Sequence, residues 1–140
     1  MWFTFSNCKS ITTVPNLNTT KATNIQGLFD NCLNLKTIPD LTFHSVGNLW
    51  SWHYYGSAVF NNCKNLTTVG NFSITDATDV SCLFYSMPVL NRVNSINLCN
   101  VPNVAQVFQS CGILNYVGAV NINKATNAES MFSGCNHIVS

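Results

Sequence analysis

Residues 22–41, ATNIQGLFDNCLNLKTIPDL, form one copy of a repeat that accounts for nearly all of the chain. A phenylalanine leads each copy, and the next phenylalanine follows after 24 residues in every case but one, where the interval is 31. The leading residues are Phe5, Phe29, Phe60, Phe84, Phe108 and Phe132. A fixed period of this length, with apolar residues in register, is typical of a solenoid in which equivalent side chains form rows.

The first half of each copy has the spacing of a short amphipathic helix. Apolar residues stand at i, i+3, i+4 and i+7, which places them on one helical face. In the quoted copy these residues are Ile25, Leu28, Phe29 and Cys32. Asn24 precedes them, and Asn is a favoured helix N-cap because its side-chain oxygen accepts from a free backbone N–H. We therefore predict a short helix in each repeat.

The second half of each copy shows the alternation of a strand. Leu41 and Phe43 flank polar Thr42, and a turn-forming residue, Pro39, precedes them. We predict a short strand, a bend and a second short extended piece. The predicted fold class is an α/β repeat, a solenoid of units of about 24 residues, each a short helix plus short strands. No single copy can bury its apolar side alone, so the copies must stack.

Length and composition limit the classes of protein. We assign residues 1–140 to a single solenoid of five full repeats with partial ends. Charged residues make up 8% of the chain and the formal net charge is +1, so the basic patch typical of nucleic-acid binding is not expected. No apolar run reaches the roughly 18 residues of a membrane span. A neutral surface of Asn, Thr and Ser favours an extracellular location, on a bacterial cell surface or a virion.

Both ends of the sequence fall within a repeat and lack a polar capping copy. We expect the chain to be a piece of a longer protein, or its two ends to be covered by partner surfaces in a homo-oligomer or larger assembly.

Seven extra residues, near 50–57, interrupt the period between Leu49 and Phe60. The insertion gathers aromatic and imidazole side chains, which could stack on sugar rings or anchor a protein contact. These candidate binding residues are Trp50, Trp52, His53, Tyr54 and Tyr55. The other interpretation is that the rings fold over the repeats as a local cap or pack against a neighbouring subunit.

Catalytic and metal-binding patterns are not expected in this sequence. Five of the seven cysteines share one apolar column with Met87, which favours reduced packing thiols over metal ligands. The spacing of zinc-binding Cys and His residues is missing. His44, His53 and His137 occupy different columns, so no shared acid–base site is implied. We predict no enzyme activity, no cofactor and no metal site.

The unit in residues 22–41, together with Met131-Phe132-Ser133-Gly134-Cys135, resembles the BspA-like leucine-rich repeats, in particular their Met-Phe/Cys/Leu variant. The resemblance covers almost the whole chain. It implies a curved, stacked leucine-rich-repeat solenoid that serves binding or adhesion without catalysis.

Two functions are consistent with these observations. The first is a surface recognition or adhesion module that binds a protein or glycan through polar rows on its strand side, with help from the insertion. These rows are Thr12, Thr13, Lys36, Thr37, Thr67, Thr68, Asn91, Arg92, Asn115 and Tyr116, among which Arg92 and Tyr116 are candidate binding residues. The alternative is a bacteriophage virion structural protein, in a fibre, tail or capsid decoration, that uses the stack as an assembly scaffold.

Overall fold

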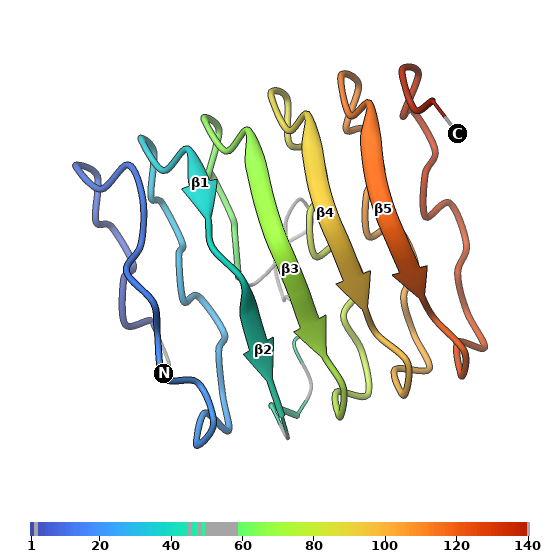
Figure 1. Cartoon of the computed structure of the whole chain (residues 1–140), viewed down its shortest axis with the longest axis horizontal. Helices are drawn as coiled ribbons and strands as arrows, with labels where there is room; N and C mark the ends of the chain where they lie inside the picture. The colour runs from blue at the N-terminus through green and yellow to red at the C-terminus, as the bar shows by residue number, and fades with distance from the viewer. Residues whose placement is uncertain (2, 45, 48, 50–58, 140) are drawn as a thin grey trace.

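A computed structural model describes the chain except for residues 2, 45, 48, 50–58 and 140 (Figure 1). Its regular elements are five strands that lie in one parallel sheet with the order β1-β3-β4-β5, in which β2 also pairs with β3. The strands are β1 (Thr37–Ile38), β2 (Leu41–Phe43), β3 (Thr68–Ile74), β4 (Arg92–Asn97) and β5 (Tyr116–Asn121).

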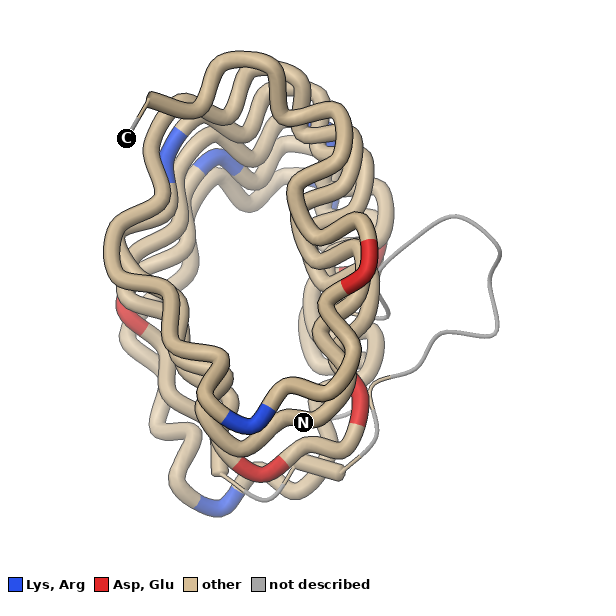
Figure 2. The backbone as a smooth tube through the Cα atoms, turned by 90° about the vertical axis from the view of Figure 1, so that its right-hand side faces the viewer, with Lys and Arg blue, Asp and Glu red and all other residues tan. Residues whose placement is uncertain are grey.

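The sheet register reproduces the period of the sequence. Thr68 pairs with Arg92, and Arg92 pairs with Tyr116, so neighbouring strands are offset by one repeat. The backbone thus winds in successive coils, and Figure 2 shows these coils stacked as an oval tube. We number the coils 1 to 6 by their leading phenylalanines, which are Phe5, Phe29, Phe60, Phe84, Phe108 and Phe132.

The predicted helix in each repeat is wrong, and with it the α/β fold class. The described residues contain no helix; the apolar stripe of each coil lies in consecutive turns instead. In coil 2, Leu28 N–H donates to Ile25 C=O at 3.1 Å and Cys32 N–H donates to Phe29 C=O at 3.2 Å. Bonds of this kind span three residues, whereas an α-helix needs four.

Positive φ angles explain why the helix does not form. They occur two residues before and two residues after the leading phenylalanine, and a right-handed helix requires negative φ throughout. The residues concerned are Phe3, Gly27, Cys82, Gln106 and Ser130 before it, and Asn7, Asn31, Asn62, Ser86, Ser110 and Gly134 after it. A helix of two turns is also marginal by itself, because its nucleation is costly.

The turns gain hydrogen bonds from the next coil in place of helical ones. Phe84 N–H donates to Val107 C=O at 2.8 Å, and Ser86 N–H donates to Gln109 C=O at 2.8 Å. Among the described residues, the other backbone bonds between these turns in neighbouring coils run the same way, from an N–H of one coil to a C=O of the following coil. The backbone polar groups are therefore satisfied between coils rather than within a helix.

The predicted bend is present in one coil and missing from three others. Pro39 separates β1 from β2, and proline has no N–H to continue the ladder. At the equivalent places, Gly70, Asn94 and Gly118 lie inside the unbroken strands β3, β4 and β5. The two extended pieces predicted for each repeat therefore merge into one strand wherever proline is absent.

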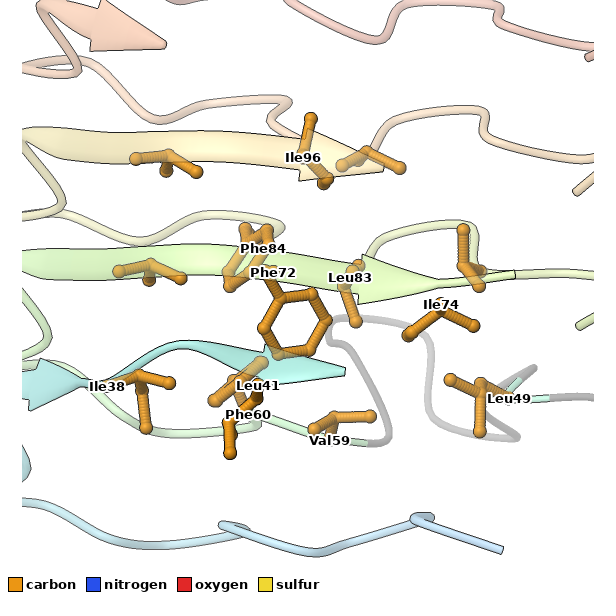
Figure 3. Close-up of a cluster of buried hydrophobic side chains, with 14 of the residues drawn as sticks. Ile38, Leu41, Leu49, Val59, Phe60, Phe72, Ile74, Leu83, Phe84 and Ile96 are labelled. Atoms are coloured by element: carbon orange, nitrogen blue, oxygen red, sulfur yellow. The ribbon is translucent and has the colours of Figure 1, made fainter. Parts of the chain in front are cut away.

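The leading phenylalanines stack on one another along the whole tube. Ring centroids of successive coils are 5.6, 5.4, 5.1, 5.4 and 5.3 Å apart, with interplanar angles of 20° or less. Phe72 from β3 meets the rings of Phe60 and Phe84 edge-on, and Figure 3 shows these rings among buried aliphatic side chains. The predicted phenylalanine column is confirmed, and it forms the centre of the core.

Asn and Asp begin the turns, as expected of capping residues, although no helix follows them. Asn24 Oδ1 accepts from Gln26 N–H at 2.8 Å, and Asp79 Oδ1 accepts from Ser81 N–H at 2.7 Å. Asn103 repeats this bond within coil 5, and its amide also donates to Asp79 Oδ2 at 2.8 Å. These residues therefore start a turn and link two coils at the same time.

The column of cysteines also links the coils. Four of its five thiols, all but that of Cys8, donate to the carbonyl oxygen of the leading phenylalanine in the preceding coil. Cys63 Sγ lies 3.0 Å from Phe29 O, and Cys111 Sγ lies 3.0 Å from Phe84 O. All seven cysteines are free thiols. Burial raises the pKa of Cys63 and of Cys111 to about 12, so these thiols stay protonated and keep the donor hydrogen.

Candidate binding surface

The structure brings two of the predicted binding residues together. Arg92 begins β4, Tyr116 begins β5, and the two are direct partners in the parallel register. Both side chains are exposed on the outer side of the sheet. The aromatic candidates of the insertion, Trp50, Trp52, His53, Tyr54 and Tyr55, lie outside the described residues.

Arg92 is held from two directions. The guanidinium carbon lies 3.9 Å from the centroid of the Tyr116 ring, which is a cation–π contact. Its Nε donates to Asn94 Oδ1 at 3.0 Å. No described residue bonds the two Nη groups, so they are available to a ligand. An arginine fixed in this way loses little side-chain entropy when it binds.

A glycine makes room for the tyrosine. A Cβ placed on Gly118 would lie 3.3 Å from the Tyr116 hydroxyl and 1.9 Å from the Asn94 carbonyl oxygen. Tyr116 therefore leans along its own strand over Gly118. The close approach of β4 to β5 at this point excludes any larger residue.

Further along the sheet, a chain of polar side chains crosses three coils. Asp40 accepts from the backbone N–H of Asn71 at 2.7 Å and from its side-chain amide at 2.8 Å. Asn71 Oδ1 in turn accepts from the Ser95 hydroxyl at 2.8 Å. The bonds from Asn71 lower the pKa of Asp40, since they favour the charged carboxylate.

Sequence reasoning missed Asp40, Asn71, Asn94 and Ser95 as members of this surface. The signal was present in the repeat, because Asp40, Asn71 and Ser95 share one column and follow directly after Pro39, Gly70 and Asn94. The turn-forming residues of the preceding column, Pro39, Gly70 and Asn94, predict a bend at this place, and a bend does not display the side chains that follow it on a sheet.

The predicted polar rows lie where the strands begin. Backbone bonds join them from coil to coil: Lys36 N–H donates to Thr12 C=O at 2.8 Å, and Thr67 N–H donates to Lys36 C=O at 2.9 Å. The exposed members of the rows are Thr12, Thr13, Lys36, Arg92, Asn115 and Tyr116, and the half-buried members are Thr37, Thr67, Thr68 and Asn91. The outer side of the sheet is therefore a surface of hydroxyl and amide groups with two cationic side chains.

The remaining titratable side chains do not converge on one point. His44 Nδ1 lies 3.2 Å from Thr75 Oγ1, and His137 Nδ1 lies 2.6 Å from Gly112 O, so each imidazole joins two neighbouring coils. Within the described part of the chain, no three His, Cys, Asp or Glu residues gather closely enough to hold a metal ion. Nor do the described residues include a helix that is long and apolar enough to cross a bilayer.

Comparison with known proteins places the chain in a family. No curated protein and no solved structure matches it. Residues 56–140, which span coils 3 to 6, match the family described as "Mycoplasma protein of unknown function, DUF285", a repeat family related to BspA-like proteins. The chain therefore belongs to the DUF285 family of repeat proteins.

Proposed function

We propose that this chain is a non-enzymatic recognition or adhesion module that binds a protein or glycan through the outer side of its sheet. We assign it to the BspA-like leucine-rich repeats of the Met-Phe/Cys/Leu type, and we place it outside the cell, on a bacterial surface or a virion. The observation that carries the proposal is the Arg92–Tyr116 pair, which lies exposed on a side of the sheet lined mainly by hydroxyl and amide groups.

The pair has the properties of a binding anchor. Arginine and tyrosine are enriched at protein interfaces because each combines apolar contact area with hydrogen-bonding groups. Here the tyrosine ring supports the guanidinium at 3.9 Å and Asn94 fixes its Nε, so the Nη groups are already oriented before a ligand arrives. A carboxylate of a protein or an acidic sugar could accept two hydrogen bonds from such a fork.

The surrounding surface suits a ligand rich in hydroxyl groups. Thr12, Thr13 and Asn115 are exposed beside the pair or along the same rows. Parallel pairing fixes the spacing of these groups, because Thr13 pairs with Thr37 and Asn115 directly precedes β5, which pairs with β4. A rigid row of donors and acceptors lowers the entropy cost of binding an extended ligand.

The test is a glycan-array and protein-panel screen with the intact chain, followed by titration of the best ligand. We expect Arg92→Ala and Tyr116→Ala each to weaken binding at least about tenfold, a loss in the range of interface hot spots. Lys124→Ala is the matched control, because it removes an exposed cation at a distance from the pair. Equal affinity for all four proteins would contradict the assignment of the pair.

The same preparations separate this function from an assembly scaffold. Light scattering after size-exclusion chromatography should show a monomer for a recognition module. Obligate multimers, together with no ligand in either screen, would favour the structural role in a virion.

A further inference from the structure

Four of the six basic residues lie at one rim of the tube. Coils 1 to 4 contribute one cation each, at positions four, seven, four and eight residues after the leading phenylalanine. These residues, which we call the basic rim, are Lys9, Lys36, Lys64 and Arg92, and all four are exposed. Lysine and arginine segments appear on the upper part of the tube in Figure 2.

Hydrogen bonds join coils 1, 2 and 3 close to the rim lysines. Asn34 of coil 2 donates its amide to Lys9 O of coil 1 at 2.8 Å. One coil further on, the amide of Asn65, which follows Lys64, donates to Leu33 O at 2.8 Å. Neighbouring strands are about 4.8 Å apart, so coils 1 to 4 offer roughly one positive charge per strand spacing. The cations alternate between the fourth residue after the leading phenylalanine and the seventh or eighth.

None of the five carboxylates belongs to this rim, and four of them accept hydrogen bonds from neutral groups. Asp30 accepts from the amide of Asn61 at 2.8 Å, and Asp79 accepts from the amide of Asn103 at 2.8 Å. Asp40 is held by Asn71, as described above. The described residues, which include every Lys, Arg, Asp and Glu, form no ion pair with one another. The charge of the rim is thus not neutralised from within, although the chain as a whole is nearly neutral.

We propose that the basic rim binds a linear polyanionic glycan whose sulfate or carboxylate groups run along the axis of the coil stack. This inference rests on the proposed function and names the class of its ligand. A band of like charges with one cation from each of four successive coils complements a polymer with repeated anionic groups. Binding would release the counterions of the polymer and would therefore weaken steeply with salt.

The neighbours of the cations favour a glycan over a nucleic acid. Tyr116 of coil 5 stacks on Arg92, but between the fourth and eighth residue after the leading phenylalanine coils 1 to 4 themselves contain Ser, Thr and Asn and no aromatic residue. Proteins that bind single-stranded nucleic acids use aromatic side chains as stacking platforms for bases. Hydroxyl and amide groups instead match the hydroxyl groups of a sugar chain.

The experiment compares dextran sulfate with uncharged dextran as ligands for the intact chain at low ionic strength. We expect binding to dextran sulfate alone. The triple variant Lys9→Gln/Lys36→Gln/Lys64→Gln should bind at least about tenfold more weakly, and its plot of log affinity against log salt should be flatter by roughly one unit per cation removed. The matched control, Lys21→Gln/Lys124→Gln, removes two exposed cations away from the rim. Its affinity for dextran sulfate should fall less than about threefold.

Three outcomes would overturn the proposal. The chain does not bind dextran sulfate, it binds both dextrans equally, or the control variant loses as much affinity as the rim variant. Single-stranded DNA that binds as tightly as dextran sulfate, with the same dependence on the rim, would replace the glycan with a nucleic acid. All substituted residues are exposed, and an unchanged midpoint of urea unfolding verifies that the variants fold.

Failure of this inference is distinguishable from failure of the proposed function. The rim variant leaves Arg92 and Tyr116 intact, and Tyr116→Ala removes the ring beside Arg92 but leaves the three rim lysines, Lys9, Lys36 and Lys64, intact. A ligand from the screens that depends on Tyr116 while dextran sulfate does not bind would refute only the basic rim.

Discussion

Replacement of a leading phenylalanine should lower the free energy of unfolding more inside the stack than at coil 6. The ring of Phe84 has three aromatic neighbours: Phe60 at 5.1 Å, Phe108 at 5.4 Å and Phe72 at 5.6 Å between centroids. Aromatic pairs contribute about 0.5–1.5 kcal/mol each beyond the burial of area. Leucine keeps most of the apolar volume but removes all three pairs, so Phe84→Leu should lower the free energy of unfolding by about 2–4 kcal/mol.

Phe132→Leu is the matched control, because it makes the same chemical change in the same column. Phe132 is 37% exposed, and its one aromatic partner among the described residues is Phe108 at 5.3 Å. Phe132→Leu should therefore lower the free energy of unfolding by about 0.5–1.5 kcal/mol. Urea unfolding followed by circular dichroism measures both values, provided that the m-values agree with that of the wild type. Equal losses for the two variants would refute the stacked column.

Two further predictions concern the thiols and the strand contacts. The pKa values of Cys63 and Cys111 are raised to about 12 from about 9, so the folded state keeps protons that the unfolded state releases, and stability should fall as pH rises from 9 to 12. Urea titrations should show a smaller fall for Cys63→Ala/Cys111→Ala, and an equal fall would assign the effect to other groups. Gly118→Ala should lower stability by about 1–3 kcal/mol, because its Cβ would lie 1.9 Å from Asn94 O. Gly112→Ala, where a Cβ meets nothing within 4 Å, should change the melting temperature little, and a larger effect there would contradict the packing described.

Much of the architecture could be predicted from the period alone. A fixed spacing of 24 residues predicts that equivalent side chains meet in successive coils. Phe29 stacks on Phe60 across the longer interval because the apolar columns resume in register after the insertion. The helix could not be excluded in this way, because a series of three-residue turns also places apolar side chains three and four residues apart. The distinguishing feature is the sign of φ at residues such as Asn31 and Ser110, which apolar spacing does not reveal. Asn tolerates positive φ and helices disfavour Gly and Asn, which was the available signal.

The candidate surface was predictable only in part. Arg92 and Tyr116 belong to one column, so their contact follows from the register. The role of Asn94 depends on the strand continuing where a bend was predicted, and this depends in turn on the absence of proline at that place. Individual repeats therefore differ in local structure even though their apolar columns are the same.

The central claim is that the stacked coils support a binding surface on the outer side of the sheet. The most direct measurement is a titration of the isotope-labelled chain with a sulfated oligosaccharide, followed by backbone amide chemical shifts. We expect the largest shifts to cluster at the beginnings of β3, β4 and β5 and around Lys36 and Arg92. Shifts that cluster instead on the turn side, around Asn103 and Asn127, would contradict it.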